Sequence, residues 1–523
     1  MNMDSTDMQM VGQSINQPVT AVWEITMACN MHCRHCGSSC MAALPDELNT
    51  EEALHLCDSL GAMGFSWITL SGGEPTLRND WHLIASALTK NGIIPNLITN
   101  GWNFDEDILN LACDAGVNTI AFSLDGLEQT HDNIRRNGSF RRILHALSIL
   151  KDSDTVKAAI ITTINRRNIG ELDQLKNRLA GMNISSWQLQ IALPMGNMKE
   201  IDHLVIGPEQ IREITDFASR AQDTSPISIQ LADCIGYHDA IEMKVRCQNT
   251  NDGRYPWQGC PAGRYSMGIL HNGDILGCTS IRDSSFIEGN IREKPIAAIW
   301  NDPGAFSWNR ARSIGQLAGL CRDCPHAVTC LGGCSNSRLT LGGSIQAENT
   351  YCLYNMSVQA VLKQQASLPD RTERLNVARC WAQNGNCQIA LRLVADLLED
   401  DPQDCAALRL SGYLQFIMGH YREAAQANQI VLQHHPQDAY ASKGLGLSLY
   451  RLGKVRQGVY HLTRAIQFAD EGFLDPYYDL ALVLFESNQL EMARKVLQKA
   501  RDQSITFTNQ SQALFDRLKD KQG

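Results

Sequence analysis

Four cysteines lie within twelve positions near the start of the chain, in the segment MACNMHCRHCGSSC at residues 27–40. Cys29, Cys33 and Cys36 form a C-x3-C-x2-C pattern, and Cys40 follows four residues later. Thiolates at this density in one loop are ligands for iron–sulfur clusters or for zinc. Three of them can hold three irons of a four-iron cluster and leave the fourth iron open, whereas structural zinc takes four ligands, of which Cys40 would be the last. Cys40 could also be a packed or a reactive thiol.

The composition limits what kind of protein can carry these thiols. The chain has 523 residues, 18 cysteines, 44% hydrophobic residues and a net charge of −10. It has no long basic stretch, so we expect no nucleic-acid partner. The first twenty residues lack the basic start and apolar core of a signal peptide, and no window is apolar enough to span a membrane. We expect a cytoplasmic chain, disordered over residues 1–20, whose clustered cysteines bind metal rather than form disulfides.

Residues 21–225 alternate between strand and helix patterns, which predicts an α/β fold with a parallel sheet. Eight such units would close a full TIM-like barrel, so six predict a partial (β/α)6 barrel, with its chemistry in the loops after the strands. Thr50 is expected to cap the first helix. The six strand-like segments are AVWEITM (21–27), WITLS (67–71), PNLIT (95–99), TIAFSL (119–124), KAAIITTI (157–164) and WQLQIAL (187–193).

The cysteine loop directly after the first strand, with His35 before its last cysteine, resembles the radical S-adenosylmethionine (SAM) superfamily. The resemblance implies that Cys29, Cys33 and Cys36 bind a reducing 4Fe–4S cluster, whose fourth iron chelates SAM. It also implies an external electron donor of the flavodoxin or ferredoxin type. The chemistry implied is cleavage of a carbon–sulfur bond of SAM, which gives a 5′-deoxyadenosyl radical that abstracts a hydrogen atom. No other catalytic residue is assigned.

Three further segments look like SAM-binding motifs of this superfamily. SGGEP ends the second strand and looks like its GGE motif, in which Gly72 and Gly73 permit close approach and Glu74 contacts the methionine amino group. SLDG after the fourth strand places Ser123 as a ribose or carboxylate contact, although a capped strand end would look the same. Arg142 in GSFRRI is a candidate for the methionine carboxylate, and a solvated helix surface is the alternative.

Residues 226–360 lose the alternation and are rich in cysteine and glycine. Their cysteine spacing resembles the SPASM extension of peptide-modifying radical enzymes, which implies two auxiliary 4Fe–4S clusters; a pair of zinc ribbons is the alternative. The eighth ligand is open: Cys247 is the first candidate, Cys234 the second, and an open iron the third. The resemblance assigns Cys321, Cys324, Cys330 and Cys352 to one cluster, and Cys260, Cys278 and Cys334 to the other.

Residues 370–505 carry a helical repeat, followed by a tail at 506–523. Gly385, Gly419 and Gly453 stand 34 residues apart, and the helical patterns on either side keep the same step. A 34-residue step between helix pairs is typical of tetratricopeptide-like arrays, although an arbitrary helical bundle remains possible. Such an array predicts a concave surface for a peptide or protein partner.

These features together predict a radical SAM/SPASM maturase that installs a cross-link, a thioether or a backbone change in a ribosomally made peptide. Sulfatase maturases carry an aspartate where this chain has Thr279, which argues against that activity. A tetrapyrrole or haem-pathway enzyme is the first alternative. A repeat-based interaction scaffold with structural clusters is the second, although it would have no need of a GGE motif.

Overall fold

The computed structural model describes residues 18–236, 242–246, 259–322, 324–470 and 473–520. The chain divides between Met356 and Ser357 into two compact units. Cys247 lies outside the described residues, as does most of the segment predicted to be disordered at the N-terminus.

The first unit is built on one ten-stranded sheet in which seven strands follow one another in parallel, in chain order. On the far side of β1, β8 (Ser266–Ile269) runs parallel to it, and β9 (Asp274–Leu276) and β10 (Gly289–Asn290) extend the sheet in antiparallel pairs. The seven parallel strands are β1 (Thr20–Thr26), β2 (Trp67–Gly72), β3 (Ile94–Thr99), β4 (Thr119–Ser123), β5 (Lys157–Ile164), β6 (Ile184–Ile191) and β7 (Ser228–Leu231).

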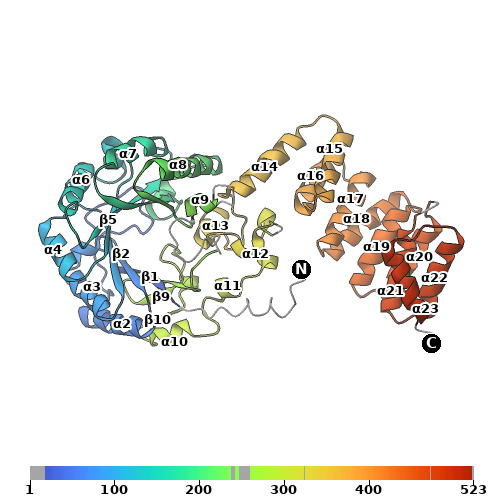
Figure 1. Cartoon of the computed structure of the whole chain (residues 1–523), viewed down its shortest axis with the longest axis horizontal. Coiled ribbons are helices and arrows are strands. Elements are labelled where there is room, and N and C mark those ends of the chain that lie inside the picture. The colour runs from blue at the N-terminus through green and yellow to red at the C-terminus, as the bar shows by residue number, and fades with distance from the viewer. Residues whose placement is uncertain (1–17, 237–241, 247–258, 323, 471–472, 521–523) are drawn as a thin grey trace. The chain divides into compact units, whose positions relative to one another are not determined.

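The crossover helices cover the outer face of these strands (Figure 1). This arrangement confirms the predicted α/β fold with a TIM-like partial barrel. Since the strands are parallel, all their carboxyl ends meet at one edge of the sheet. The helices are α2 (Thr50–Ala62), α3 (Trp81–Lys90), α4 (Glu106–Asp114), α5 (Glu128–Ile134), α6 (Ser139–Leu150), α7 (Leu172–Leu179) and α8 (Ile211–Thr224).

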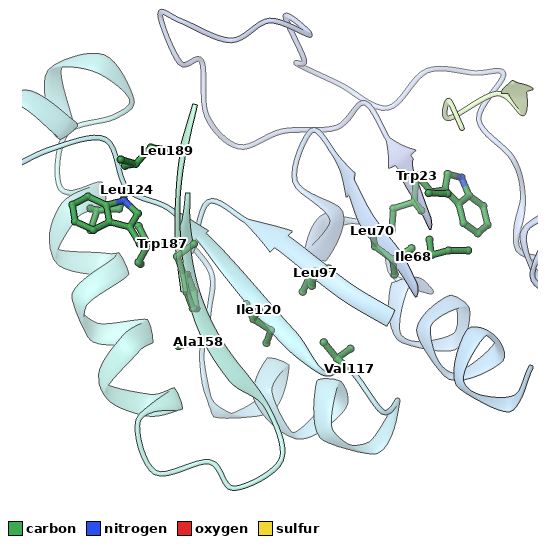
Figure 2. Packing of buried hydrophobic residues seen from close by; sticks show 14 of the residues in the cluster. Trp23, Ile68, Leu70, Leu97, Val117, Ile120, Leu124, Ala158, Trp187 and Leu189 are labelled. Atoms are coloured by element: carbon green, nitrogen blue, oxygen red, sulfur yellow. The ribbon is translucent and has the colours of Figure 1, made fainter. Parts of the chain in front are cut away.

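The core lies between the strands and these helices, as Figure 2 shows. Side chains alternate along each strand, so every second residue of β1 to β6 can face this layer. Trp23, Ile68 and Ile120 are at most 1% exposed. The buried rows that hold β1 to β6 together also fix where each strand ends, and so where the loops that follow them begin.

Two details of the barrel differ from the sequence-based predictions. A seventh parallel strand, β7, lies in the region that was expected to break the alternation. Its four residues, SIQL, are too short to give a strand pattern of their own. The prediction that Thr50 caps the first helix was wrong: Asn49 is the cap, and it forms a reciprocal capping box with Glu52.

Between β7 and the end of the first unit, the described residues form mostly loops and helices, with only the strands β8 to β10 among them. No described helix anywhere in the chain is long and apolar enough to cross a lipid bilayer. The helices of this region are α9 (Glu242–Arg246), α10 (Ile296–Trp300), α11 (Ser307–Arg310), α12 (Ala327–Cys330), α13 (Ser335–Gly342) and α14 (Leu353–Ala366).

The described part of the second unit is built of helices in antiparallel pairs. The first helices of three successive pairs begin at residues 371, 405 and 439, and the second helices at 387, 421 and 455, a step of 34 residues in both series. The last helix lies within the segment predicted as a tail, and buries Phe515. The helices are α15 (Arg371–Gln383), α16 (Cys387–Asp400), α17 (Cys405–Ile417), α18 (Tyr421–His434), α19 (Ala439–Arg451), α20 (Val455–Gln467), α21 (Asp475–Glu486), α22 (Leu490–Asp502) and α23 (Asn509–Asp520).

A candidate cysteine-lined site at the strand ends

The loop after β1 carries Cys29, Cys33 and Cys36, all of them free thiols. The loop is tied to the far side of the barrel by Asn197, which follows β6. The backbone N–H of Asn197 donates to the carbonyl of Cys36 at 2.9 Å, and its side-chain amide donates to the carbonyl of Cys33 at 3.0 Å. The three thiols therefore sit on a loop that is anchored to the carboxyl ends of two strands.

The predicted glycine turn after β2 packs directly on the backbone leading into this loop. The N–H groups of Gly73 and Glu74 donate to the carbonyls of Thr26 and Ala28 at 2.8 and 2.7 Å. A Cβ atom on Gly73 would lie 2.1 Å from the Ala28 carbonyl oxygen, a distance that no side chain could occupy. Glycine is needed here because two backbones meet.

Glu74 lies at the centre of a hydrogen-bonded cluster and is only 1% exposed. Its carboxylate accepts hydrogen bonds from the hydroxyls of Thr76 and Thr99 at 2.6 and 2.8 Å, and from the N–H of Asn100 at 2.7 Å. Burial raises the pKa of Glu74, and these hydrogen bonds oppose the rise. The carboxylate thus ties the glycine turn to the end of β3 whether or not it also meets an ammonium group.

Each of the three cysteine sulfurs has a polar neighbour. The Asn100 amide approaches the Cys29 sulfur at 3.9 Å, and the Arg135 guanidinium approaches the Cys33 sulfur at 3.8 Å. A hydrogen bond with the Cys40 thiol lowers the pKa of Cys36 to about 5. Burial raises the pKa of Cys33 to about 11, against the lowering effect of Arg135. Hydrogen bonds to ligand sulfurs are one way in which proteins set cluster potentials.

Asp125 connects this group of side chains and is completely buried. Its carboxylate accepts from the Arg135 guanidinium at 2.5 Å, from His35 at 2.8 Å and from the N–H of Thr163 at 2.7 Å. Burial opposes ionisation of Asp125, but the charges of Arg135 and His35 outweigh it and hold its pKa well below the usual range. Asp125 thereby fixes both a residue of the cysteine loop and the cation beside Cys33.

The structure separates the remaining predicted contacts from this network. Ser123 ends β4, half-buried, and its hydroxyl has no hydrogen-bond partner among the described residues. Arg142 is exposed on α6, with its guanidinium 5.3 Å above the ring of Trp102. Sequence reasoning missed Asn100, Asp125 and Arg135, although Asp125 stands within the SLDG segment that drew attention to Ser123.

The cysteine-rich region brings its first predicted set together. Cys321, Cys324, Cys330 and Cys352 line one pocket, which has Leu320, Ala327 and Tyr354 among its other walls. Two backbone N–H groups face these sulfurs: that of Asn349 donates to Cys321 at 3.3 Å, and that of His326 to Cys324 at 3.4 Å. Four thiols around one small, largely apolar space form a donor set that suits an iron–sulfur cluster.

The second predicted set is also brought together. The pKa of Cys278 is raised by burial and by the charge of Cys260, and that of Cys334 by burial and by the charges of Cys260 and Cys234. Cys260 thus interacts with both Cys278 and Cys334, and the second candidate for an additional ligand, Cys234, interacts with Cys334. The first candidate, Cys247, lies outside the described residues.

A partial parallel barrel with three free thiols on the loop after its first strand, joined to a second cysteine-rich region, is the architecture of an iron–sulfur enzyme. Residues 23–179 match the family model of the radical SAM superfamily, and residues 260–325 match that of SPASM, an iron–sulfur cluster-binding domain. Of the predicted auxiliary ligands, Cys330, Cys334 and Cys352 lie beyond the second match.

Similar proteins agree with these two matches. The AdoMet-dependent heme synthase of Methanosarcina barkeri is 29% identical over 352 residues, covering 65% of this chain and 97% of that protein. The mycofactocin maturase MftC of Mycolicibacterium smegmatis is 25% identical over 355 residues, covering 67% and 87%. The structure of Streptococcus suis SuiB bound to precursor peptide SuiA shares the fold, with a TM-score of 0.53 and 17% identity over 66% of this chain and 77% of that one.

The chain therefore carries a radical SAM domain and a SPASM iron–sulfur cluster-binding domain. It is therefore an enzyme whose cofactors are SAM and 4Fe–4S clusters. These relatives include a mycofactocin maturase and an AdoMet-dependent heme synthase, so the two domain matches alone do not name the reaction.

Proposed function

We propose that this enzyme is a maturase that modifies a peptide or protein, with its reducing cluster on Cys29, Cys33 and Cys36. The observation that carries the proposal is the placement of three free thiols on one anchored loop at the strand ends, each beside a polar neighbour. When bound there, cluster and SAM supply a carbon radical that removes a hydrogen atom from the substrate.

The chain's own residues hold that site in a fixed geometry. Asp125 fixes Arg135 and His35, and Glu74 fixes the glycine turn against the cysteine loop. The Gly72–Gly73 backbone then offers a close approach for the amino-acid end of SAM. Ser123, whose hydroxyl is unpaired within the described structure, and Arg142 are its further proposed contacts. The two cysteine sets of the SPASM region would hold two auxiliary clusters, and a flavodoxin- or ferredoxin-type donor in the cytoplasm would supply the electrons.

The second unit offers a surface for the substrate. A groove of about 500 Å³ runs along the first helices of three successive pairs, and it is lined by residues that include Arg379, Arg409, Tyr413 and Tyr440. The two tyrosines are 44% and 37% exposed. Arg409 pairs with Asp438, but Arg379 has no acidic partner among the described residues. Aromatic side chains beside an uncompensated cation suit an acidic peptide segment with apolar residues.

The groove can be tested with a labelled twelve-residue peptide of Glu and Leu and its Lys and Leu counterpart, using fluorescence anisotropy on the full chain. Arg379→Glu and Tyr413→Ala are each expected to weaken binding of the acidic peptide about tenfold, since aromatic and arginine anchors dominate such interfaces. Arg422→Glu, on an exposed position of α18 outside the groove, is the matched control. Equal binding of both peptides would remove the groove from the proposal.

The reaction itself is tested by anaerobic reconstitution with SAM and a reductant. We expect 5′-deoxyadenosine from the reconstituted enzyme and none from Cys33→Ala. A haem-pathway reaction is the second candidate, because the heme synthase of Methanosarcina barkeri is 29% identical. A mass change in a candidate precursor peptide would support the maturase, and a modified tetrapyrrole would support the alternative. Without any 5′-deoxyadenosine, neither radical reaction stands.

A further inference from the structure

Arg338 on α13 carries a buried guanidinium group. Its side chain lies in the SPASM region and the residue is only 1% exposed. None of its three guanidinium nitrogens has a hydrogen-bond partner within the described parts of the chain. A guanidinium cannot shed its proton in a protein, so it needs a counter-charge when it is withdrawn from water. The described parts of the chain show no such charge hydrogen-bonded to the Arg338 guanidinium.

The charges that act most strongly on Arg338 all come from cysteines. They are Cys321 and Cys330 of the first predicted set, and Cys260 and Cys334 of the second. The geometry agrees: the guanidinium packs on Gly332, which stands between Cys330 and Cys334 in sequence and whose would-be Cβ lies 2.8 Å from Nη1 of Arg338. The backbone N–H of Arg338 donates to the carbonyl of Cys334 at 3.3 Å. A neutral thiol offers no counter-charge, but a metal-bound cysteine is a thiolate. The missing partner of Arg338 thus becomes negatively charged when the two sets bind their metals.

A second buried arginine lies beside the second set. Arg312 is 9% exposed; one of its terminal nitrogens donates to the Ser335 hydroxyl at 3.0 Å, and the other has no partner among the described residues. Cys260 and Cys334 are the thiols that act on it, and Arg338 repels it. Two like charges buried together favour an anionic group between or beside them.

We propose that Arg338 is the shared counter-ion of the two auxiliary clusters, placed between their ligand sets and compensated only when both are loaded. The inference rests on the proposed function, because it takes these cysteines as the ligands of two clusters. It assigns to Arg338 a positioning and redox-tuning role that does not require contact with substrate. A positive charge beside a cluster favours the reduced form, so Arg338 makes both auxiliary clusters easier to reduce.

The test compares Arg338→Met with Arg322→Met, which removes an exposed arginine next to Cys321. In the metal-free chain, Arg338→Met is expected to raise the melting temperature, because it removes an uncompensated charge. In the loaded enzyme, it is expected to lower the ratio of reduced to oxidised auxiliary cluster about tenfold at a fixed potential, which equals about 59 mV for one electron. Arg322→Met should change neither quantity.

The potential is read by electron paramagnetic resonance during a redox titration of the full chain, from the signals that do not respond to added SAM. Arg338→Lys keeps the charge and should stay within about twofold of the unchanged protein. If iron analysis and these signals give no auxiliary clusters in the unchanged protein, the proposed function fails at that point. If the clusters are present and Arg338→Met behaves as Arg322→Met does, the counter-ion inference alone is wrong.

Discussion

Asp125 holds the cysteine loop against the barrel, because its carboxylate binds both His35 of the loop and Arg135 at the end of α5. The ion pair with Arg135 is buried, so removing one partner leaves an uncompensated charge, at a cost of about 3–5 kcal/mol. We therefore expect Asp125→Asn to lower the melting temperature of the first unit by roughly 10 °C, since 1 kcal/mol corresponds to about 2–4 °C in domains of this size. Calorimetry of the full chain measures it.

The matched control for Asp125→Asn is Glu128→Gln, which breaks the exposed pair between Glu128 and Arg141. Exposed pairs contribute less than about 1 kcal/mol, so the control should stay close to the unchanged protein. Equal effects of the two substitutions would show that Asp125 is not a structural centre of the site.

Gly73 gives a second test at the scale of one residue. A methyl group at this position would lie 2.1 Å from the Ala28 carbonyl oxygen, so the backbone just before Cys29 must move. Gly73→Ala is expected to cost about 1–3 kcal/mol and to lower the iron bound by the chain. Gly170→Ala is the control, because nothing lies within 4 Å of its would-be Cβ. Iron analysis of both proteins after anaerobic reconstitution would separate a local effect from a general glycine effect.

The cysteine loop could be predicted from residue types and spacing alone, because its three predicted ligands are neighbours in sequence. The side chains that orient the loop are not: Asp125 stands 90 residues from His35, and Arg135 stands 102 from Cys33. Such pairs become visible only when the strand ends have been brought together. Glu74 was predicted from its motif, but its four protein donors come from neighbouring backbone and threonines that no motif records.

At the scale of elements, the predictable features are those that repeat or alternate. The 34-residue step appeared in the glycine series and returns in the first residues of six helices. The strands β1 to β6 were each marked by a run of apolar, β-branched residues. The short strands β7 to β10 were not, because two to four residues cannot establish an alternating pattern. The place of β8 in the sheet also depends on β1, which lies far along the chain.

The packing of α21 against α19 makes the stability of the second unit (Ser357–Gly523, here called the repeat unit) sensitive to pH. Asp479 on α21 lies 3.9 Å from Lys443 on α19, and burial raises its pKa to about 6, with Lys443 opposing the rise and Asp475 adding to it. A carboxyl group whose pKa is higher in the folded state than in the unfolded state contributes to the stability of the folded state. That contribution is fully present at pH values below the unfolded pKa of about 3.9. That contribution is lost as the pH rises through 6.

We therefore expect Asp479→Asn to stabilise the repeat unit at pH 7.5, by about 2 kcal/mol or roughly 5 °C, and to stabilise it by less than half as much at pH 4.5. Thermal unfolding at both pH values measures the change. Asp502→Asn, at an exposed position on α22, is the control and should change the melting temperature little at either pH. A stabilisation that is the same at both pH values would show that charge burial is not its cause.

At the scale of the whole molecule, the division at Met356 separates a metal-binding unit from an all-helical one. The first unit contains all eleven predicted cluster ligands, Cys247 among them, and binding energy at metal sites contributes to folding energy. In the second unit, buried rows such as Leu480, Leu484 and Phe515 hold the helices together. The two units should therefore respond differently when the clusters are removed.

The prediction is two calorimetric transitions in the full chain, only one of which depends on iron. Removing the clusters with a chelator and an oxidant should lower the transition of the first unit by more than about 10 °C, because its apo form loses the metal bonds and leaves Arg338 uncompensated. The transition of the repeat unit should stay within about 1 °C, because its core contains no predicted ligand. Asp479→Asn identifies that second transition, since it should shift it alone at pH 7.5. If both transitions moved together on iron removal, the two units would be energetically coupled, and the stability of the repeats could not be assigned to their own helices.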